Sequence, residues 1–180
     1  MGKELISPVM GEHLEKRMYF FVIYQLTGIQ KGIQCGHTVE QYAHNYRDDV
    51  DYINFVENWK TWIVLDGGTT NNNIDTLDFG TLNKILIELR ENNIKHGYFH
   101  EPDLNNALTA VCFMADERVF DFVKFPDYIK PEFISGDTEI EFFENENYSK
   151  HLYTQWLESI GGEYNLYLRE LIKGKRKASN

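Results

Sequence analysis

Four polar residues in the segment GIQKGIQCGHTVEQ recur at helical spacing and could act together on a ligand. Counted from Gln34, the residues His37, Thr38 and Gln41 follow three, four and seven positions later. A helix over about 33–47 would therefore place them on one face. Because an imidazole can take up a proton near neutral pH, this set indicates a binding or general-base site. The alternative interpretation is the ordinary solvent-facing side of a helix.

The segment that leads into this helix adds further candidates. It follows the apolar run MYFFVIYQL, which predicts a buried strand at about 18–26. In open α/β sheets, ligands bind at the carboxyl ends of strands, and the first amides of a helix attract anions. Gly28 would let the backbone approach such a ligand, while Gln30 and Lys31 would supply polar contacts. A turn residue that simply faces solvent is the other interpretation of Lys31.

A second polar cluster lies in YFHEPDLNNALTAV, between two further apolar segments. Its proline, aspartate and asparagines are typical of a hairpin turn, which is the simpler interpretation. If the strand before it runs parallel to the first strand, Glu101, Asp103 and Asn106 emerge at the same sheet edge as His37. A carboxylate beside an imidazole fixes its tautomer and raises its basicity, as general-base hydrolysis requires.

The elements that must position these residues alternate along the chain. Strands are predicted at about 18–26 and 61–66, in HGYFHE and in ALTAVCFMA, and helices at about 33–47, in DVDYINFVENW and in TLNKILIELRENN. This order predicts a three-layer α/β domain over 18–125, with a mostly parallel or mixed sheet. Residues 1–17 are expected to form an arm. Residues 126–180 are expected to form an acidic segment and a mainly helical extension with a basic tail.

Composition limits the possible partners and compartments. The net charge is −10 and the pI about 5.0, so the whole-molecule field disfavours polyanions unless positive charge gathers on one face. The two cysteines, Cys35 and Cys112, do not form a closely spaced ligand cluster, and no metal is expected. Without a signal-peptide pattern or an apolar run near 18 residues, the sequence predicts a cytoplasmic protein that does not enter a membrane.

Three separated motifs resemble the type 2 peptidyl-tRNA hydrolases, particularly a divergent bacterial and viral branch with a Glu-Pro-Asp motif. They are the Gln-Cys-x-His pattern at residues 34–37, the segment NWKTWIVLDGG, and IKHGYFHEPDLNNALTAV. Together they cover about 18–115. The resemblance implies an α/β/α sandwich around a four-stranded mixed sheet, a homodimer, no metal or organic cofactor, and hydrolysis of the ester between a peptide and tRNA.

The resemblance also implies a set of site residues. Gln34 and His37 match the family motif directly, while Asp103 and Thr109 correspond by their place in the last two strands. The family lysine lies four residues before the motif glutamine, where this chain has Gln30, and Lys31 follows one position later. The expected catalytic set is therefore His37, Asp103, Lys31 and Thr109. The other residues named above would contact the ligand, namely Gly28, Gln30, Gln34, Thr38, Gln41, Glu101 and Asn106.

Three functions follow from these observations. The first is a hydrolase of peptidyl-tRNA or a similar aminoacyl ester, in which His37 assists attack by water, Asp103 orients His37, and Lys31 stabilises the oxyanion. The second is binding or cleavage of a small nucleotide-type signalling ligand in the same pocket, which an acidic protein can accommodate. The third is a non-catalytic interaction protein that uses the acidic segment 132–146 and the C-terminal helices as its contact surface.

Overall fold

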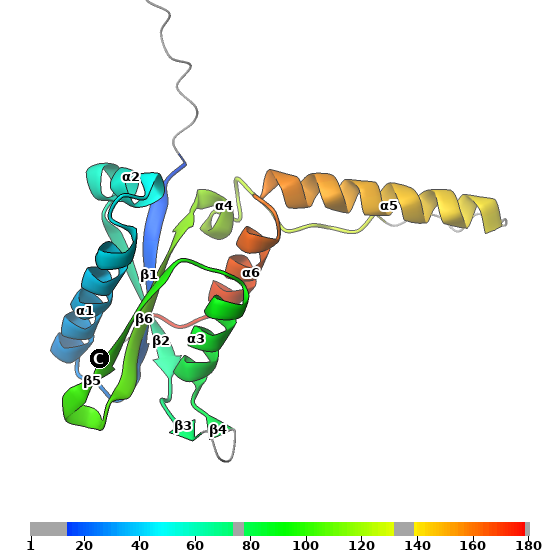
Figure 1. The fold of residues 1–180 in the computed structure, drawn as a ribbon. Coiled ribbons are helices and arrows are strands. Elements are labelled where there is room, and N and C mark those ends of the chain that lie inside the picture. The colour runs from blue at the N-terminus through cyan, green and yellow to red at the C-terminus, as the bar shows by residue number, and fades with distance from the viewer. Residues whose placement is uncertain (1–13, 74–77, 132–138, 179–180) are drawn as a thin grey trace, which may run out of the picture.

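A four-stranded mixed sheet forms the centre of the molecule (Figure 1). The computed structural model describes residues 14–73, 78–131 and 139–178, without the side chains of 72–73 and 139–145. The strands are β1 (Lys16–Ile23), β2 (Thr61–Gly68), β5 (His96–Glu101) and β6 (Ala107–Asp116), in the order β2-β1-β6-β5. β1 and β2 are parallel, and β6 is antiparallel to both β1 and β5. β1 and β5 therefore run in the same direction, and their carboxyl ends share one edge.

Helices cover both faces of this sheet. α1 (Gly28–Tyr46) and α2 (Val50–Asn58) lie on one face, and α3 (Thr81–Glu91) and α6 (Glu163–Ile172) on the other (Figure 1). The predicted three-layer α/β/α sandwich around a four-stranded mixed sheet is thus confirmed. The remaining elements are the short pair β3 (Asn72–Asn73) and β4 (Asp78–Phe79), the 3₁₀ turn η1 (Pro102–Leu104), α4 (Glu117–Phe120), and α5 (Glu139–Ser159), which projects from the sandwich.

The two-residue period of β1 divides the core into two clusters. Tyr19 and Phe21 pack toward α3 and α6, while Met18, Phe20 and Val22 pack toward α1 and α2. All five side chains are buried, as expected for a strand with a neighbour on each side and a helix layer on each face. The near-continuous apolar run that predicted this strand therefore reflects two buried faces.

α1 begins at Gly28, five residues before the predicted start at residue 33. Thr27 forms the N-cap, and a capping box joins its side chain and backbone to Gln30. A Cβ atom at Gly32 or Gly36 would meet no atom within 4 Å, so neither glycine serves a close approach. Residues 28–32, expected to lead into the helix, are therefore part of it, because the capping signal at Thr27 outweighs the low helix propensity of glycine.

The C-terminal part of the chain belongs in part to the same sandwich. Leu168 and Leu171 of α6 are buried in the core between the sheet and the helices α3 and α6. Beyond α6, the backbone N–H of Asp66 donates to the carbonyl of Arg176 at 3.0 Å. The backbone N–H of Ala178 donates to the carbonyl of Val64 at 2.9 Å. This pairing covers the outer edge of β2. Residues 1–13 of the predicted arm and 132–138 of the predicted acidic segment lie outside the described residues.

Candidate functional site

A polar network joins the start of α1 to the last two strands of the sheet. The Thr109 hydroxyl donates to Oε1 of Gln34 at 2.5 Å, and Nε2 of Gln34 donates to Oε2 of Glu101 at 2.7 Å. Thr109 is 0% and Gln34 5% exposed. A carboxylate can only accept hydrogen bonds, so Glu101 fixes the orientation of the Gln34 amide. The parallel course of β1 and β5 thus brings together three of the sequence-predicted residues.

Lys31 belongs to the same buried stripe of α1. The buried positions are Lys31, Gln34, Cys35, Thr38 and Tyr42, and they follow helical spacing. Lys31 is 7% exposed, which is rare for a lysine and requires compensating contacts. Because α1 already begins at Gly28, Lys31 lies one helical turn before Gln34, on the side of α1 that faces the sheet. Lys31 therefore lies on the same side of α1 as Gln34, although it follows the position of the family lysine by one residue.

His37 lies next to this stripe and is held by an aromatic contact. Its ring stacks on Phe99 of β5, with centroids 4.3 Å apart and planes inclined by 25°. The predicted partner Asp103 is exposed in η1, and no hydrogen bond or ion pair between described residues joins it to His37. The expected role of Asp103 in orienting His37 is therefore not supported, because the turn of η1 carries its side chain into solvent. Phe99 positions the imidazole, and no spacing rule in the sequence pointed to it.

Four other residues were expected to contact a ligand, and three of them form hydrogen bonds with residues nearby in the sequence. The side-chain oxygen of Gln30 accepts from the backbone N–H and the hydroxyl of Thr27, both at 3.0 Å, so Gln30 caps the helix. Nε2 of Gln41 donates to Asn45 at 3.3 Å. Asn106 is an exposed turn residue with φ of 59°, and its carbonyl contacts Nδ1 of His100 at 2.9 Å. Gly28 is exposed at the first position of α1.

Thr38 corrects the expected orientation of the polar face. It is 0% exposed, and its hydroxyl donates to the Cys35 carbonyl at 2.8 Å. Its own carbonyl accepts from the Cys112 thiol at 3.4 Å, where Gly97 lets α1 approach β5 closely. Gln34 and Thr38 thus face the sheet, and the solvent-facing interpretation of this polar face is wrong for both residues. The reason is that the buried face of α1 is wider than its apolar stripe.

The two cysteines do not supply a nucleophile. Burial raises the pKa of both the Cys35 and Cys112 thiols to about 12, so both are protonated at neutral pH. Among the residues that the structure describes, no group of three or more His, Cys, Asp or Glu side chains could hold a metal ion. The polar groups that the structure brings together around α1 are amide, hydroxyl, carboxylate, ammonium and imidazole groups.

These features define an α/β sandwich with a buried polar cluster where α1 meets the carboxyl end of β5. Comparison with protein-family models and with curated proteins finds no match to this chain. Across the described ranges, no helix has both the length and the apolar character needed to cross a membrane.

Proposed function

We propose that the protein is a carboxylic-ester hydrolase of the peptidyl-tRNA or aminoacyl-tRNA type. The observation that carries this proposal is the direct contact between Gln34 and Thr109, two residues 75 positions apart that the family resemblance assigns to one site. Glu101 extends the contact to the end of β5, and Lys31 adds a cation to the same buried stripe of α1. A cation and an imidazole are groups that can serve ester hydrolysis, as oxyanion stabiliser and as general base.

The proposed roles follow from the chemistry of each group. His37 takes a proton from water as the water oxygen attacks the ester carbonyl. Lys31 stabilises the negative charge that develops on the carbonyl oxygen. The bond between the acyl carbon and the ribose oxygen then breaks, and the ribose oxygen receives the proton from His37. Gln34 and Thr109 hold the start of α1 in register with β5 and β6.

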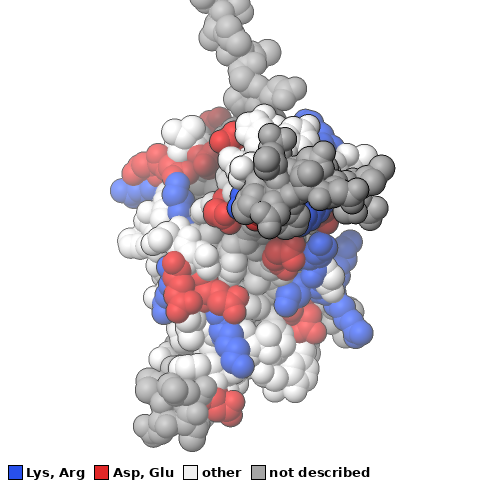
Figure 2. Space-filling model, turned by 90° about the vertical axis from the view of Figure 1, so that its right-hand side faces the viewer, with Lys and Arg blue, Asp and Glu red and all other residues white. Residues whose placement is uncertain are grey.

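The charge distribution favours a second candidate, a small nucleotide-type ligand in the same site. The net charge is −10, and on the face that carries α3, α5 and α6, Lys and Arg are interspersed with Asp and Glu (Figure 2). A small ligand needs one or two phosphate contacts, whereas tRNA needs a longer basic surface. The two candidates share Lys31 and the start of α1, and they differ in whether an ester is cleaved.

The test is to incubate the purified protein with N-acetyl-aminoacyl-tRNA at low salt and measure release of the acyl group. His37→Ala is expected to lower the rate by roughly 10²- to 10⁴-fold. The matched control is His44→Ala, which makes the same change at an exposed position two turns further along α1. Lys31→Met is expected to reduce the rate by about 10²-fold, with circular dichroism confirming that each variant is folded.

Absence of acyl release by folded wild-type protein at low salt would contradict the esterase proposal. A panel of mononucleotides and dinucleotides is then compared by thermal melting, because a ligand that binds only the folded state raises the melting temperature. A shift that disappears in Lys31→Met would favour the small nucleotide ligand. Equal rates for His37→Ala and His44→Ala would exclude His37 as the base.

A further inference from the structure

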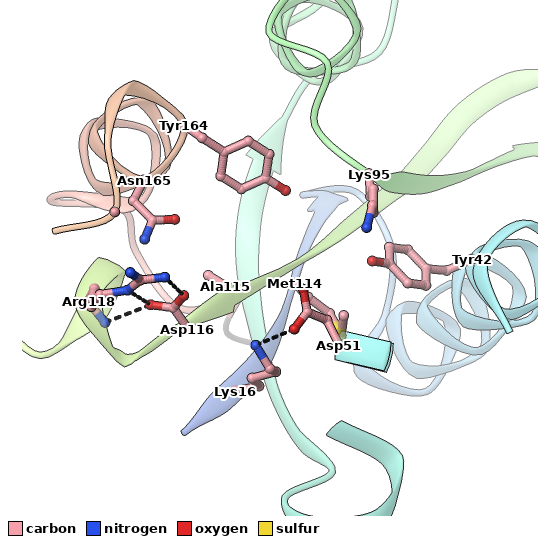
Figure 3. Close-up of a pocket in the computed structure, with 11 residues that line it drawn as sticks. Lys16, Tyr42, Asp51, Lys95, Met114, Ala115, Asp116, Arg118, Tyr164 and Asn165 are labelled. Carbon is pink, nitrogen blue, oxygen red and sulfur yellow. Dashed lines mark hydrogen bonds and ion pairs between the residues drawn. The ribbon is translucent and has the colours of Figure 1, made fainter. Parts of the chain in front are cut away.

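A pocket of about 320 Å³ lies at the opposite end of the sheet from the candidate site (Figure 3). It is bounded by the first residue of β1, the last residues of β6, the residue before β5, and parts of α1, α2, α4 and α6. Lys16, Tyr42, Lys95, Arg118 and Tyr164 provide most of its polar side chains. Pockets of this size are within the range that holds small ligands. None of these five residues belongs to the proposed esterase site.

The pocket lies along an uncovered part of the sheet. β5 begins at His96 opposite Phe113, whereas β6 continues to Asp116, so within the described residues the last three residues of β6 have no strand partner on the β5 side. The side chains of Met114 and Ala115 belong to cores on opposite faces of the sheet, yet both residues line the pocket. The pocket therefore follows the strand edge, where backbone N–H and C=O groups are presented for pairing.

Tyr42 provides a buried donor that is aimed into this space. Its side chain is 1% exposed, and its hydroxyl forms no hydrogen bond within the described part of the chain. Figure 3 shows the hydroxyls of Tyr42 and Tyr164 pointing toward the same region as the Lys95 ammonium. Burial raises the pKa of Tyr164 to about 12 and raises the pKa of Tyr42 as well, so both hydroxyls remain protonated donors at neutral pH.

The charged groups of the pocket leave mainly donors for a ligand. Both oxygens of Asp116 accept from Arg118, at 3.0 and 2.7 Å, and Asp51 contacts Lys16 at 2.9 Å. Lys95 contacts Asp49. Each lysine ammonium has three N–H groups, and a single carboxylate does not use all of them. Three cations and two carboxylates line the pocket, an excess of one positive charge, so the pocket suits a ligand with one negative charge better than a polyphosphate.

We propose that this pocket binds an α-carboxylate group, carried by an amino acid or by the end of a short extended peptide. The carboxylate would lie among the Tyr42 hydroxyl and the Lys16 and Lys95 ammonium groups. The adjoining peptide backbone would pair with the uncovered edge of β6 at residues 114–116, as in recognition by strand addition. The preference for a single negative charge comes from the excess of one cation in the lining, and the preference for a peptide backbone comes from the open strand edge.

The proposal is tested by NMR titration of the ¹⁵N-labelled full chain with acetyl-Ala-Ala-Ala bearing a free carboxylate. Saturable shifts are expected at the amides of residues 16, 95 and 114–116. The same peptide with an amidated C-terminus is expected to bind at least tenfold more weakly, because it lacks the charged acceptor. Free alanine distinguishes the two sources, since equal affinity for alanine indicates an amino-acid site and weaker binding indicates a peptide site.

Three variants make the test specific. Tyr42→Phe is expected to weaken binding roughly tenfold, whereas Tyr46→Phe makes the same change on a neighbouring ring that does not line the pocket. Lys95→Gln, at a more exposed position, is expected to weaken binding to a similar degree even if Tyr42→Phe proves unstable. The proposal is overturned if neither the peptide nor alanine produces saturable shifts at 10 mM, a concentration about tenfold above a millimolar dissociation constant. Equal binding of the free and amidated peptides would also overturn it.

Discussion

The hydroxyl of Thr109 on β6 lies 2.5 Å from the side-chain oxygen of Gln34 on α1, in a fully buried setting. A hydrogen bond without competing water contributes to stability and also fixes geometry, because losing either partner leaves a buried polar group unsatisfied. This contact therefore sets where the start of α1 lies relative to the last strand. It also couples the stability of the fold to the arrangement of the proposed site.

Thr109→Val should show how strong this coupling is. Valine keeps the shape of threonine but leaves the Gln34 oxygen without its donor, so we expect a loss of about 1–3 kcal/mol in the free energy of unfolding. Gln34→Leu should cost a similar amount, because the Thr109 hydroxyl can turn to the Phe99 carbonyl at 3.3 Å but the Glu101 carboxylate loses the donor it has at 2.7 Å. The measurement is urea unfolding of both single variants and the double variant.

The double variant decides whether the two residues interact directly. A coupling energy of about 1 kcal/mol is expected, so the double variant should be less destabilised than the sum of the single changes. Thr154→Val is the control, since its exposed hydroxyl bonds to the Lys150 carbonyl at 3.0 Å and its loss should cost under about 0.5 kcal/mol. Strict additivity at positions 34 and 109 would contradict the contact.

Two glycines near the site should respond to alanine in opposite directions. A Cβ atom at Gly97 would overlap the Thr38 carbonyl and lie 3.0 Å from the Cys112 sulfur, so Gly97→Ala must force α1 away from β5. We expect a loss of about 3 kcal/mol or more in the free energy of unfolding. Gly32→Ala meets no atom within 4 Å in an exposed position of α1, so it should stabilise the protein by about 0.5–1 kcal/mol. Urea unfolding measures both, and a stable Gly97→Ala variant would contradict the close approach.

Much of the fold was predictable from local patterns. The segment HGYFHE matches β5 residue for residue, and the apolar spacing of TLNKILIELRENN predicted α3. The predicted strand at about 18–26 begins two residues and ends three residues after the observed β1. The reason is that Tyr24, Gln25 and Leu26 extend the uncharged run beyond Ile23, the last residue of β1. Period-two and helical spacing are fixed by backbone geometry, so such elements can be derived without knowledge of the tertiary structure.

The orientation of polar residues on α1 was harder to predict. The spacing placed Gln34, His37 and Thr38 on one face, but it could not indicate that the face meets the edge of β5 and β6. That arrangement depends on Gly97, which is 59 positions or more from these residues in sequence and allows the helix to approach. The contact between His37 and Phe99 depends on the same packing. Hydrophobic periodicity describes single elements, whereas the site arises from the contact between two of them.

The position of His37 should depend on Phe99 rather than on Asp103. Phe99→Ala removes the ring on which the imidazole stacks, and we expect the rate of acyl release from N-acetyl-aminoacyl-tRNA to fall about tenfold. Asp103→Asn alters an exposed carboxylate with no described contact to His37, so its effect should remain below about threefold. Each rate is measured under single-turnover conditions with a folding check. A large loss in Asp103→Asn with an unchanged Phe99→Ala rate would reverse the assignment.

Acid should weaken the attachment of α6 through Asp127. Arg169 of α6 is 1% exposed and donates to Asp127 at 2.8 Å, and Lys173 contacts the other carboxylate oxygen at 3.1 Å. The hydrogen bond from Arg169, followed by that from Lys173, lowers the pKa of Asp127 below its usual value. A lowered folded-state pKa means that the stabilisation is fully present above the unfolded value of about 3.9 and is lost as the pH falls through the folded value.

Asp127→Asn should therefore reduce the free energy of unfolding at pH 7 by about 1 kcal/mol, since the carboxylate is partly exposed. The difference from wild type should shrink as the pH falls from 5 to 3, because the wild-type carboxylate then becomes protonated as well. Urea unfolding at pH 7, 5 and 3 measures this convergence. Glu170→Gln is the matched control, because Glu170 contacts Lys173 at 3.7 Å and does not contact Arg169 among the described ion pairs. A difference between Asp127→Asn and wild type that stays constant from pH 7 to pH 3 would show that the ionised carboxylate is not what Arg169 recognises.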